Sequence, residues 1–244
     1  MGDPIGRFHR TFNAVFTIVF GTLDQAIAIA RRLHRRHAAV HGVMPGAVGP
    51  FPAGSGYRAN DLGPLTWVQA TLTETCVLVY DLILPALTET ERERYYAESR
   101  QFAGLSGIPS SSLPADWRGF LAYNAQMHRS DVLTVSREAR MIVQKLLFNA
   151  SSWRRMPAWY SALTAGLLPG PLREGFGLRY GRAERRIAER ALGCFRQIYP
   201  ILPDRLRFVG PYQEARTRLA GAARPDICVR FLNRIWIGRP LQGS

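Results

Sequence analysis

The chain's apolar residues recur at helical spacing almost from end to end, and no segment alternates cleanly between apolar and polar residues as a strand would. Thr22 and Gln25 have the T-x-x-Q spacing of an N-terminal capping box, and Thr88 and Glu91 repeat it as T-x-x-E. The 244 residues are enough for one sizeable core. These features predict an all-α, single-domain, multi-helix bundle.

The helix boundaries follow from these caps and from glycine and proline breaks. Helices are expected over residues 5–19, 23–41, 64–84, 88–102, 114–129, 136–148, 153–167, 181–199 and 211–219. Residues 44–56 are rich in Gly and Pro and are expected to form a loop. In this interpretation residues 1–221 are the helical domain, and residues 222–244 are an unassigned C-terminal tail.

One predicted helix holds three of the chain's five histidines. At about 100° per residue, His34, His37 and His41 fall within an arc of about 60°. Ala30 and Ala38 flank them, while three arginines project on the opposite side. We expect a buried face of imidazole and methyl groups, where the small alanines leave room for a flat ligand. The alternative is a surface helix that happens to be rich in Arg and His.

The chain is strongly basic, with 32 Lys and Arg against 18 Asp and Glu and a net charge of +14. Nearly all of the basic residues are arginines, since Lys145 is the only lysine. They are scattered over many helices, and aromatic residues are not interleaved with them as a stacking platform would need. The pattern predicts a generally basic surface and no specific nucleic-acid partner.

The three cysteines are odd in number, far apart and without C-x-x-C spacing, so we interpret them as reduced. Together with an N-terminus that lacks a signal-peptide layout, this predicts a cytoplasmic location. The most apolar segments, residues 12–20 and 76–87, are too short to span a bilayer, and the second contains Asp81 and Pro85. No transmembrane segment is expected. The sequence leaves open whether the chain forms a homo-oligomer.

The most apolar long helix, over residues 64–84, is expected at the centre of the core. Gln69 lies on its face with Leu65, Leu72 and Thr73. A buried amide without a partner costs roughly 1–3 kcal/mol, so we expect Gln69 to be hydrogen-bonded.

Other polar residues are candidates for a catalytic or a structural role. Glu74 and Asp81 are seven residues apart on one helix face and could form a catalytic carboxylate pair, or one of them could pair with a core arginine. His9 fits a structural role, and His128 fits a surface position near a helix C-terminus. Hydrolase, nucleotide-binding and zinc-protease motifs are absent from the sequence.

Several short motifs follow one another in a specific order over residues 4–220. They include Pro4-Ile-Gly-Arg-Phe-His-Arg-Thr-Phe12, Val19-Phe-Gly-Thr22, the histidine helix, Tyr57-Arg-Ala-Asn-Asp61, Trp67-Val-Gln-Ala-Thr-Leu72, Glu91-Arg-Glu-Arg-Tyr-Tyr96, Leu113-Pro-Ala-Asp-Trp117 and Thr164-Ala-Gly-Leu-Leu-Pro169. In this order the motifs resemble the MpaB-like and latex-clearing-protein (rubber oxygenase) family.

The resemblance implies an all-helical fold that holds a b-type haem (heme b) between helices and uses dioxygen on a small apolar organic substrate. A globin-like haem-binding core is one arrangement open to it. Family members commonly have histidine, the proximal iron ligand, where this chain has Gln69. The resemblance therefore implies that His37 or a neighbour supplies the axial bond, or that the cofactor is bound weakly.

These observations lead to one interpretation and its alternatives. The chain is predicted to be a b-type-haem-dependent oxygenase, with His37 as the iron ligand. The predicted catalytic residues are His34, His37 and Glu74. The predicted cofactor-binding residues are Ala30, His34, His37, Ala38, His41, Leu65, Gln69, Leu72 and Thr73. The main alternative is a non-catalytic helical protein that binds haem or another apolar ligand, and a nucleic-acid-binding module, argued only from charge, is the third.

Overall fold

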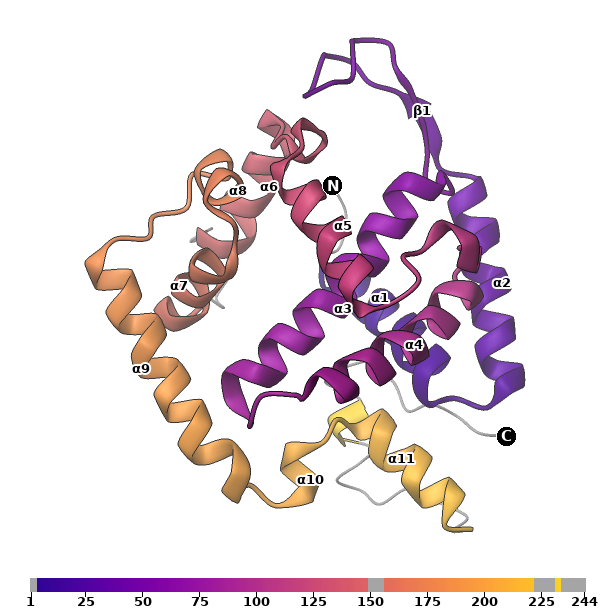
Figure 1. The fold of residues 1–244 in the computed structure, drawn as a ribbon, viewed down its shortest axis with the longest axis vertical. Coiled ribbons are helices and arrows are strands. Elements are labelled where there is room, and N and C mark those ends of the chain that lie inside the picture. Colours follow the sequence, from indigo (N-terminus) through magenta and orange to yellow (C-terminus); the bar gives the residue numbers. More distant parts are fainter. Residues whose placement is uncertain (1–3, 149–155, 222–230, 234–244) are drawn as a thin grey trace.

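The structure consists of helices arranged around a long central helix, α3 (Leu62–Ile83) (Figure 1). The computed structural model of the chain describes residues 4–148, 156–221 and 231–233. Its only sheet in these ranges is a small hairpin of β1 and β2. The expected all-α multi-helix fold is therefore confirmed.

The remaining elements follow the predicted order closely. The helices are α1 (Pro4–Phe20), α2 (Leu23–Ala38), α4 (Glu89–Leu105), α5 (Trp117–Arg129), α6 (Arg137–Phe148), α7 (Ala158–Leu167), α8 (Gly170–Gly175), α9 (Arg182–Ile198), α10 (Asp204–Arg207) and α11 (Gly210–Leu219). The strands are β1 (His41–Val43) and β2 (Gly56–Arg58), and short 3₁₀ turns cover Ser110–Ser112, Asp131–Leu133 and Tyr199–Ile201.

Both predicted capping boxes are present. The Thr22 hydroxyl accepts from the backbone N–H of Gln25, whose side chain accepts from the backbone N–H of Thr22. Thr88 and Glu91 form the same reciprocal pair at the start of α4. These bonds satisfy backbone donors that a helix start leaves unpaired, which explains why the two helices begin where the sequence predicts.

The histidine helix ends earlier than predicted, so the expectation of a helix through His41 is wrong. α2 stops at Ala38, and His41 lies in β1, paired with Arg58 of β2. The Tyr57 ring lies against Gly42, where a Cβ would come within 2.8 Å of the phenol oxygen. The hairpin pairing thus withdraws His41 from the helix, and the sequence offered no strand periodicity from which to predict it.

Helices distant in sequence lie against α1 and α3. α1 packs with α2 and α11, and α3 packs with α4 and α9 (Figure 1). Arg196 on α9 donates to the Leu82 carbonyl at 2.6 Å, and Arg218 on α11 donates to the Phe20 carbonyl at 2.7 Å. Some of the scattered arginines therefore join helix ends.

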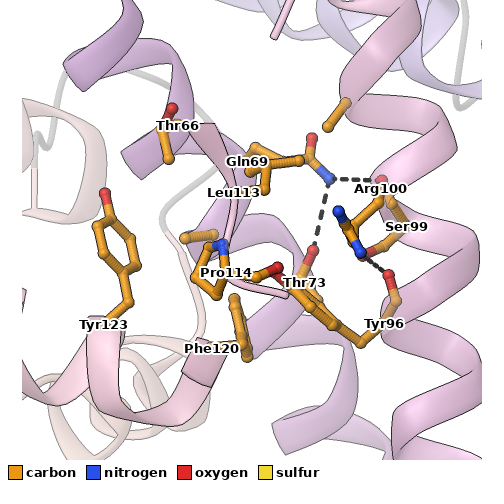
Figure 2. A pocket seen from close by; sticks show the side chains of 12 residues that line it. Thr66, Gln69, Thr73, Tyr96, Ser99, Arg100, Leu113, Pro114, Phe120 and Tyr123 are labelled. Carbon is orange, nitrogen blue, oxygen red and sulfur yellow. Dashed lines mark hydrogen bonds between the residues drawn. The ribbon is translucent and has the colours of Figure 1, made fainter. Parts of the chain in front are cut away.

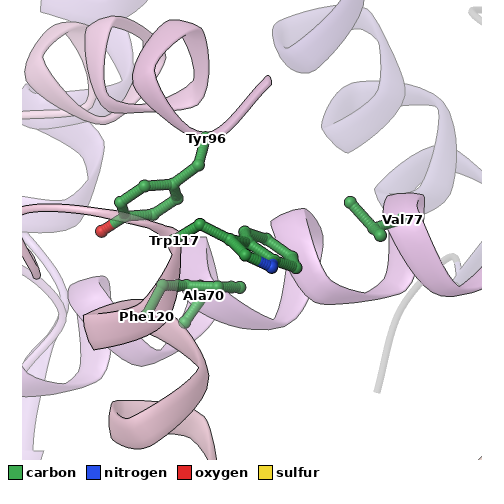
Figure 3. Packing of buried hydrophobic residues seen from close by; sticks show 5 residues of the cluster. All are labelled: Ala70, Val77, Tyr96, Trp117 and Phe120. Atoms are coloured by element: carbon green, nitrogen blue, oxygen red, sulfur yellow. The ribbon is translucent and has the colours of Figure 1, made fainter. Parts of the chain in front are cut away.

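The core lies between α3, α4 and α5. Tyr96 from α4 and Trp117 and Phe120 from α5 pack beside Ala70 of α3, as Figure 3 shows, and Val77 belongs to the same cluster. Ring centroids are 4.8 Å apart for Tyr96 and Phe120 and 5.1 Å apart for Trp117 and Phe120. The small Ala70 leaves space beside α3 for these rings, so close helix packing and aromatic burial occur together.

The remaining expectations concern cysteines, membrane spans and the tail. Cys76 and Cys194 are unpaired, whereas Cys228 lies outside the described residues. Within the described ranges, no helix combines the length and the apolar character needed to cross a membrane. In the tail, Asn233 is buried and donates to the Glu214 carboxylate at 2.7 Å. The boundary at residue 221 and the cytoplasmic location stay predictions.

Phe120→Ala tests whether this aromatic cluster anchors the fold. Phe120 is 2% exposed, so we expect the free energy of unfolding to fall by about 3–5 kcal/mol, from lost burial and the cavity left behind. The matched control is Leu121→Ala on the same helix, where 47% exposure predicts a change below about 1 kcal/mol. Urea unfolding measures both, and similar losses in the two variants would contradict the assignment.

Candidate functional site

A small cavity lies between α3, α4 and α5, next to the aromatic core (Figure 2). Its lining is Thr66, Gln69, Ala70 and Thr73 from α3, Tyr96, Ser99, Arg100 and Ala103 from α4, Leu113 and Pro114 from the following segment, and Phe120 and Tyr123 from α5. Its volume of about 10 Å³ has room for about one water molecule.

Gln69 and Thr73 are the two predicted site residues that line this cavity, and Gln69 joins two of its helices. Gln69 is 8% exposed, and its amide nitrogen donates to the Ser99 carbonyl of α4 at 3.3 Å and to the Thr73 hydroxyl at 3.5 Å (Figure 2). The buried amide therefore has the hydrogen-bond partner that the sequence required. Because its nitrogen joins α3 to α4, Gln69 has a structural role at the position where the resemblance places an iron ligand.

Two side chains of α4 form hydrogen bonds to the segment between α4 and α5, which lines the cavity. The Tyr96 hydroxyl donates to the Pro114 carbonyl at 2.8 Å, and Arg100 donates to the carbonyls of Ala115 and Ser110 at 3.0 and 3.3 Å. Burial raises the pKa of Tyr96 to about 12, although nearby Arg100 opposes this shift. The phenol is thus held neutral as a hydrogen-bond donor.

The structure corrects the expected buried face of the histidine helix. His34, Ala38 and His41 are exposed, whereas His37 and Ala30 are half-buried. α2 packs on α1 and α4, and in the described residues only Ala26 of α2 is fully buried. The second half of α2 therefore presents most of its expected ligand face to solvent.

His37 keeps the chemistry of a ligand even though it lies outside the cavity lining. Burial, together with the nearby positive groups of His34 and Arg36, lowers the pKa of His37 below its ordinary value of about 6.5. Its imidazole is therefore neutral at pH 7, with a nitrogen lone pair available.

The predicted cofactor residues do not form one lining. Gln69 and Thr73 line the cavity, whereas Leu65 is half-buried and Leu72 is 42% exposed on the same helix. The α2 residues lie outside this lining. The nine predicted cofactor-binding residues are thus divided between the α3–α4–α5 cavity, the remaining surface of α3 and α2 with its following strand.

A haem does not fit the cavity around Gln69. Small-molecule pockets measure about 300–1,000 Å³, far above the volume between α3 and α5. Haem iron usually takes His, Cys, Met or Tyr, and of these types the cavity lining contains only Tyr96 and Tyr123. Burial raises the pKa of both phenols and so opposes the ionised form that would bind iron. By donor type His37 fits, and Gln69 does not. Among the described residues, no three His, Cys, Asp or Glu side chains gather as a site for a free metal ion.

His128 is a functional candidate that the sequence interpretation missed. It was expected at the surface, but its ring lies edge-on to Trp67 at 5.4 Å, and its Nε2 is 3.2 Å from the Glu74 carboxylate. Asp81 instead pairs with Arg92 at 2.7 Å. The alternative for these two carboxylates, an arginine partner for one of them, is therefore confirmed for Asp81. The spacing of Trp117, Phe120 and Asn124 before His128 could have indicated its half-buried face.

Comparison with known proteins adds one match. A family model described as "ER-bound oxygenase mpaB/B'/Rubber oxygenase, catalytic domain" matches residues 1–197. Neither the curated proteins nor the solved structures contain a match to the chain. The matched range includes α1 to α8 and nearly all of α9, and thus the whole α3–α4–α5 cavity.

The raised pKa of Tyr96 predicts a late ionisation. A tyrosine that is neutral in the fold and has a raised pKa contributes stability below pH about 10, and this stability is lost as the pH rises through about 12. We expect Tyr96→Phe to remove one late-ionising group from the tyrosinate absorbance titration. If the group that Tyr96→Phe removes ionises below pH about 10, that result contradicts the burial of Tyr96.

Proposed function

Because this chain belongs to the mpaB and rubber oxygenase catalytic-domain family, we propose that it is an oxygenase that uses b-type haem and dioxygen to oxidise a small apolar organic substrate. The family match over residues 1–197 is the observation that carries the proposal. When bound, the haem would supply an iron for dioxygen chemistry, and the protein would bind and orient the haem.

His37 is the residue that we propose as the iron ligand. Three observations support it: its imidazole is neutral, it is half-buried, and it lies on a helix that packs against α4 of the core. His34, with its exposed side chain one turn earlier, is the next nearest histidine on that helix. Catalytic roles for His34 and Glu74 stay predictions.

An apolar substrate is supported by the surface of α3. Val68, Leu72 and Val79 lie at helical spacing on this central helix and are 56%, 42% and 39% exposed. Exposed apolar side chains on one face of a helix are typical of a surface that binds an apolar molecule. Charge supports no particular substrate, because the arginines are distributed over the surface.

A second candidate function is favoured by Gln69. Its buried amide is hydrogen-bonded into α4, so position 69 is built as part of the core and offers iron no suitable donor. On this observation the chain would be a non-catalytic relative that binds haem or another apolar ligand. Measuring haem content and turnover separately distinguishes the two functions.

The haem proposal predicts a spectrum. Protein expressed with haem supplied should show a Soret band, and a pyridine haemochrome assay should find one b-type haem per chain. Dithionite and carbon monoxide should then shift the band, as expected for a haem with an accessible iron position. Finding no iron porphyrin under these conditions would reject the haem proposal.

His37→Ala tests the proposed ligand. We expect loss of haem or a strong shift of the Soret band, because the variant lacks the neutral imidazole. His34→Ala and His41→Ala are matched controls at exposed positions and should have milder effects. A His37→Ala spectrum identical to that of the wild type would show that another residue holds the iron.

Gln69→His tests the second candidate function. If the wild-type chain lacks haem because position 69 lost its iron ligand, the imidazole should give the variant a Soret band that the wild type lacks. Gln69→Asn, which keeps a carboxamide, is the control and should stay colourless. Unchanged spectra in both variants would show that this face of α3 does not meet a haem.

A further inference from the structure

The inward face of α5 contains polar groups that the proposed function does not use. Trp117, Phe120, Asn124 and His128 follow one another at three- and four-residue spacing, so they lie on one face of the helix. Trp117 and Phe120 belong to the aromatic core. An amide and an imidazole thus continue an otherwise apolar stripe.

Asn124 is almost completely enclosed, with 2% of its surface exposed. Neither its carbonyl oxygen nor its amide nitrogen has a hydrogen-bond partner within the described ranges. Leaving such a group buried without a partner destabilises the fold, whereas a leucine of similar size would carry no such cost. An amide with both functions unpaired is typical of a site that binds a polar molecule.

His128, four residues later on α5, has another buried unpaired atom. Its Nε2 contacts both Glu74 carboxylate oxygens, at 3.2 and 3.3 Å, while its Nδ1 is buried and has no partner among the residues that the structure describes. An ionised carboxylate only accepts hydrogen bonds, so in the neutral ring Nε2 carries the hydrogen. Nδ1 is then an acceptor.

The two unpaired groups are neighbours on α5. Helical side chains lean toward the N-terminus, so the His128 ring lies over the turn that contains Asn124. Residues at this spacing have Cβ atoms about 5–6 Å apart. Of the two ring nitrogens, Nδ1 is closer to the helix backbone, because Nε2 reaches across to Glu74 on α3.

We propose that His128 Nδ1 and the Asn124 amide bind one small hydroxyl-bearing molecule of the size of water between α5 and α3. Its O–H donates to Nδ1 and its oxygen accepts from the Asn124 amide nitrogen, which gives each of these two nitrogens a hydrogen-bond partner. Glu74 is the positioning residue, because its carboxylate fixes the ring tautomer that leaves Nδ1 as an acceptor. This site is separate from the haem proposal and does not depend on it.

The first experiment uses the wild-type protein, with water itself as the probe. In protein labelled with ¹⁵N at histidine, we expect His128 to show a protonated Nε2 and an unprotonated Nδ1. Water-to-protein cross-relaxation should show a long-lived water at the Asn124 amide protons. A protonated Nδ1, or the absence of a bound water, overturns the proposal.

Variants separate binding from a merely structural role. Asn124→Leu should shift the ¹⁵N resonance of His128 Nδ1, whereas Asn60→Leu, which alters an amide bonded to the His34 carbonyl, should leave that resonance and the water signal unchanged. Glu74→Leu should change the His128 tautomer population, and Glu98→Leu, in an exposed pair on α4, should not. Unchanged His128 signals in Asn124→Leu and Glu74→Leu overturn the proposal, and the wild-type measurement decides it if a variant does not fold.

Discussion

The wedge of aromatic rings between α3, α4 and α5 is the packing on which the rest of the structure depends. Phe120 is buried against Tyr96 and Trp117, and Ala70 is the small α3 residue beside which they pack. Burying each ring contributes on the order of 2–3 kcal/mol, which makes this cluster a large part of the stability of an otherwise open helical chain. The same packing determines which side chains face the adjoining cavity.

Position 69 shows how this packing limits the chemistry. Gln69 lies in the wall of the cavity, and its amide nitrogen bonds to Ser99 on the neighbouring helix. A histidine at this position would place an imidazole in the core. The glutamine instead places an amide there, which hydrogen-bonds α3 to α4. The family membership supports an oxygenase function. The Gln69 side chain is the strongest argument that this member of the family binds its ligand differently. The half-buried His37 offers a different iron donor outside the cavity.

The α5 face adds a second polar region to the same core. Asn124 and His128 are the polar residues on a stripe that begins with Trp117 and Phe120, and Glu74 contacts His128 from α3. A carboxylate that orients an imidazole is a common way to prepare a histidine for ligand binding or proton transfer. Buried polar atoms without a partner among the described residues therefore lie on α5, whereas His34 of α2 is exposed.

The sequence by itself determined the helical class, most helix boundaries and the family, because caps, glycine and proline breaks and apolar spacing are local signals. It also predicted that Gln69 needs a partner. Only the tertiary structure decided that the partner is Ser99, that His41 belongs to a hairpin, and that Glu74 meets His128. Each of these contacts joins segments distant in the chain, and helical periodicity contains no information about which helix a polar face will meet.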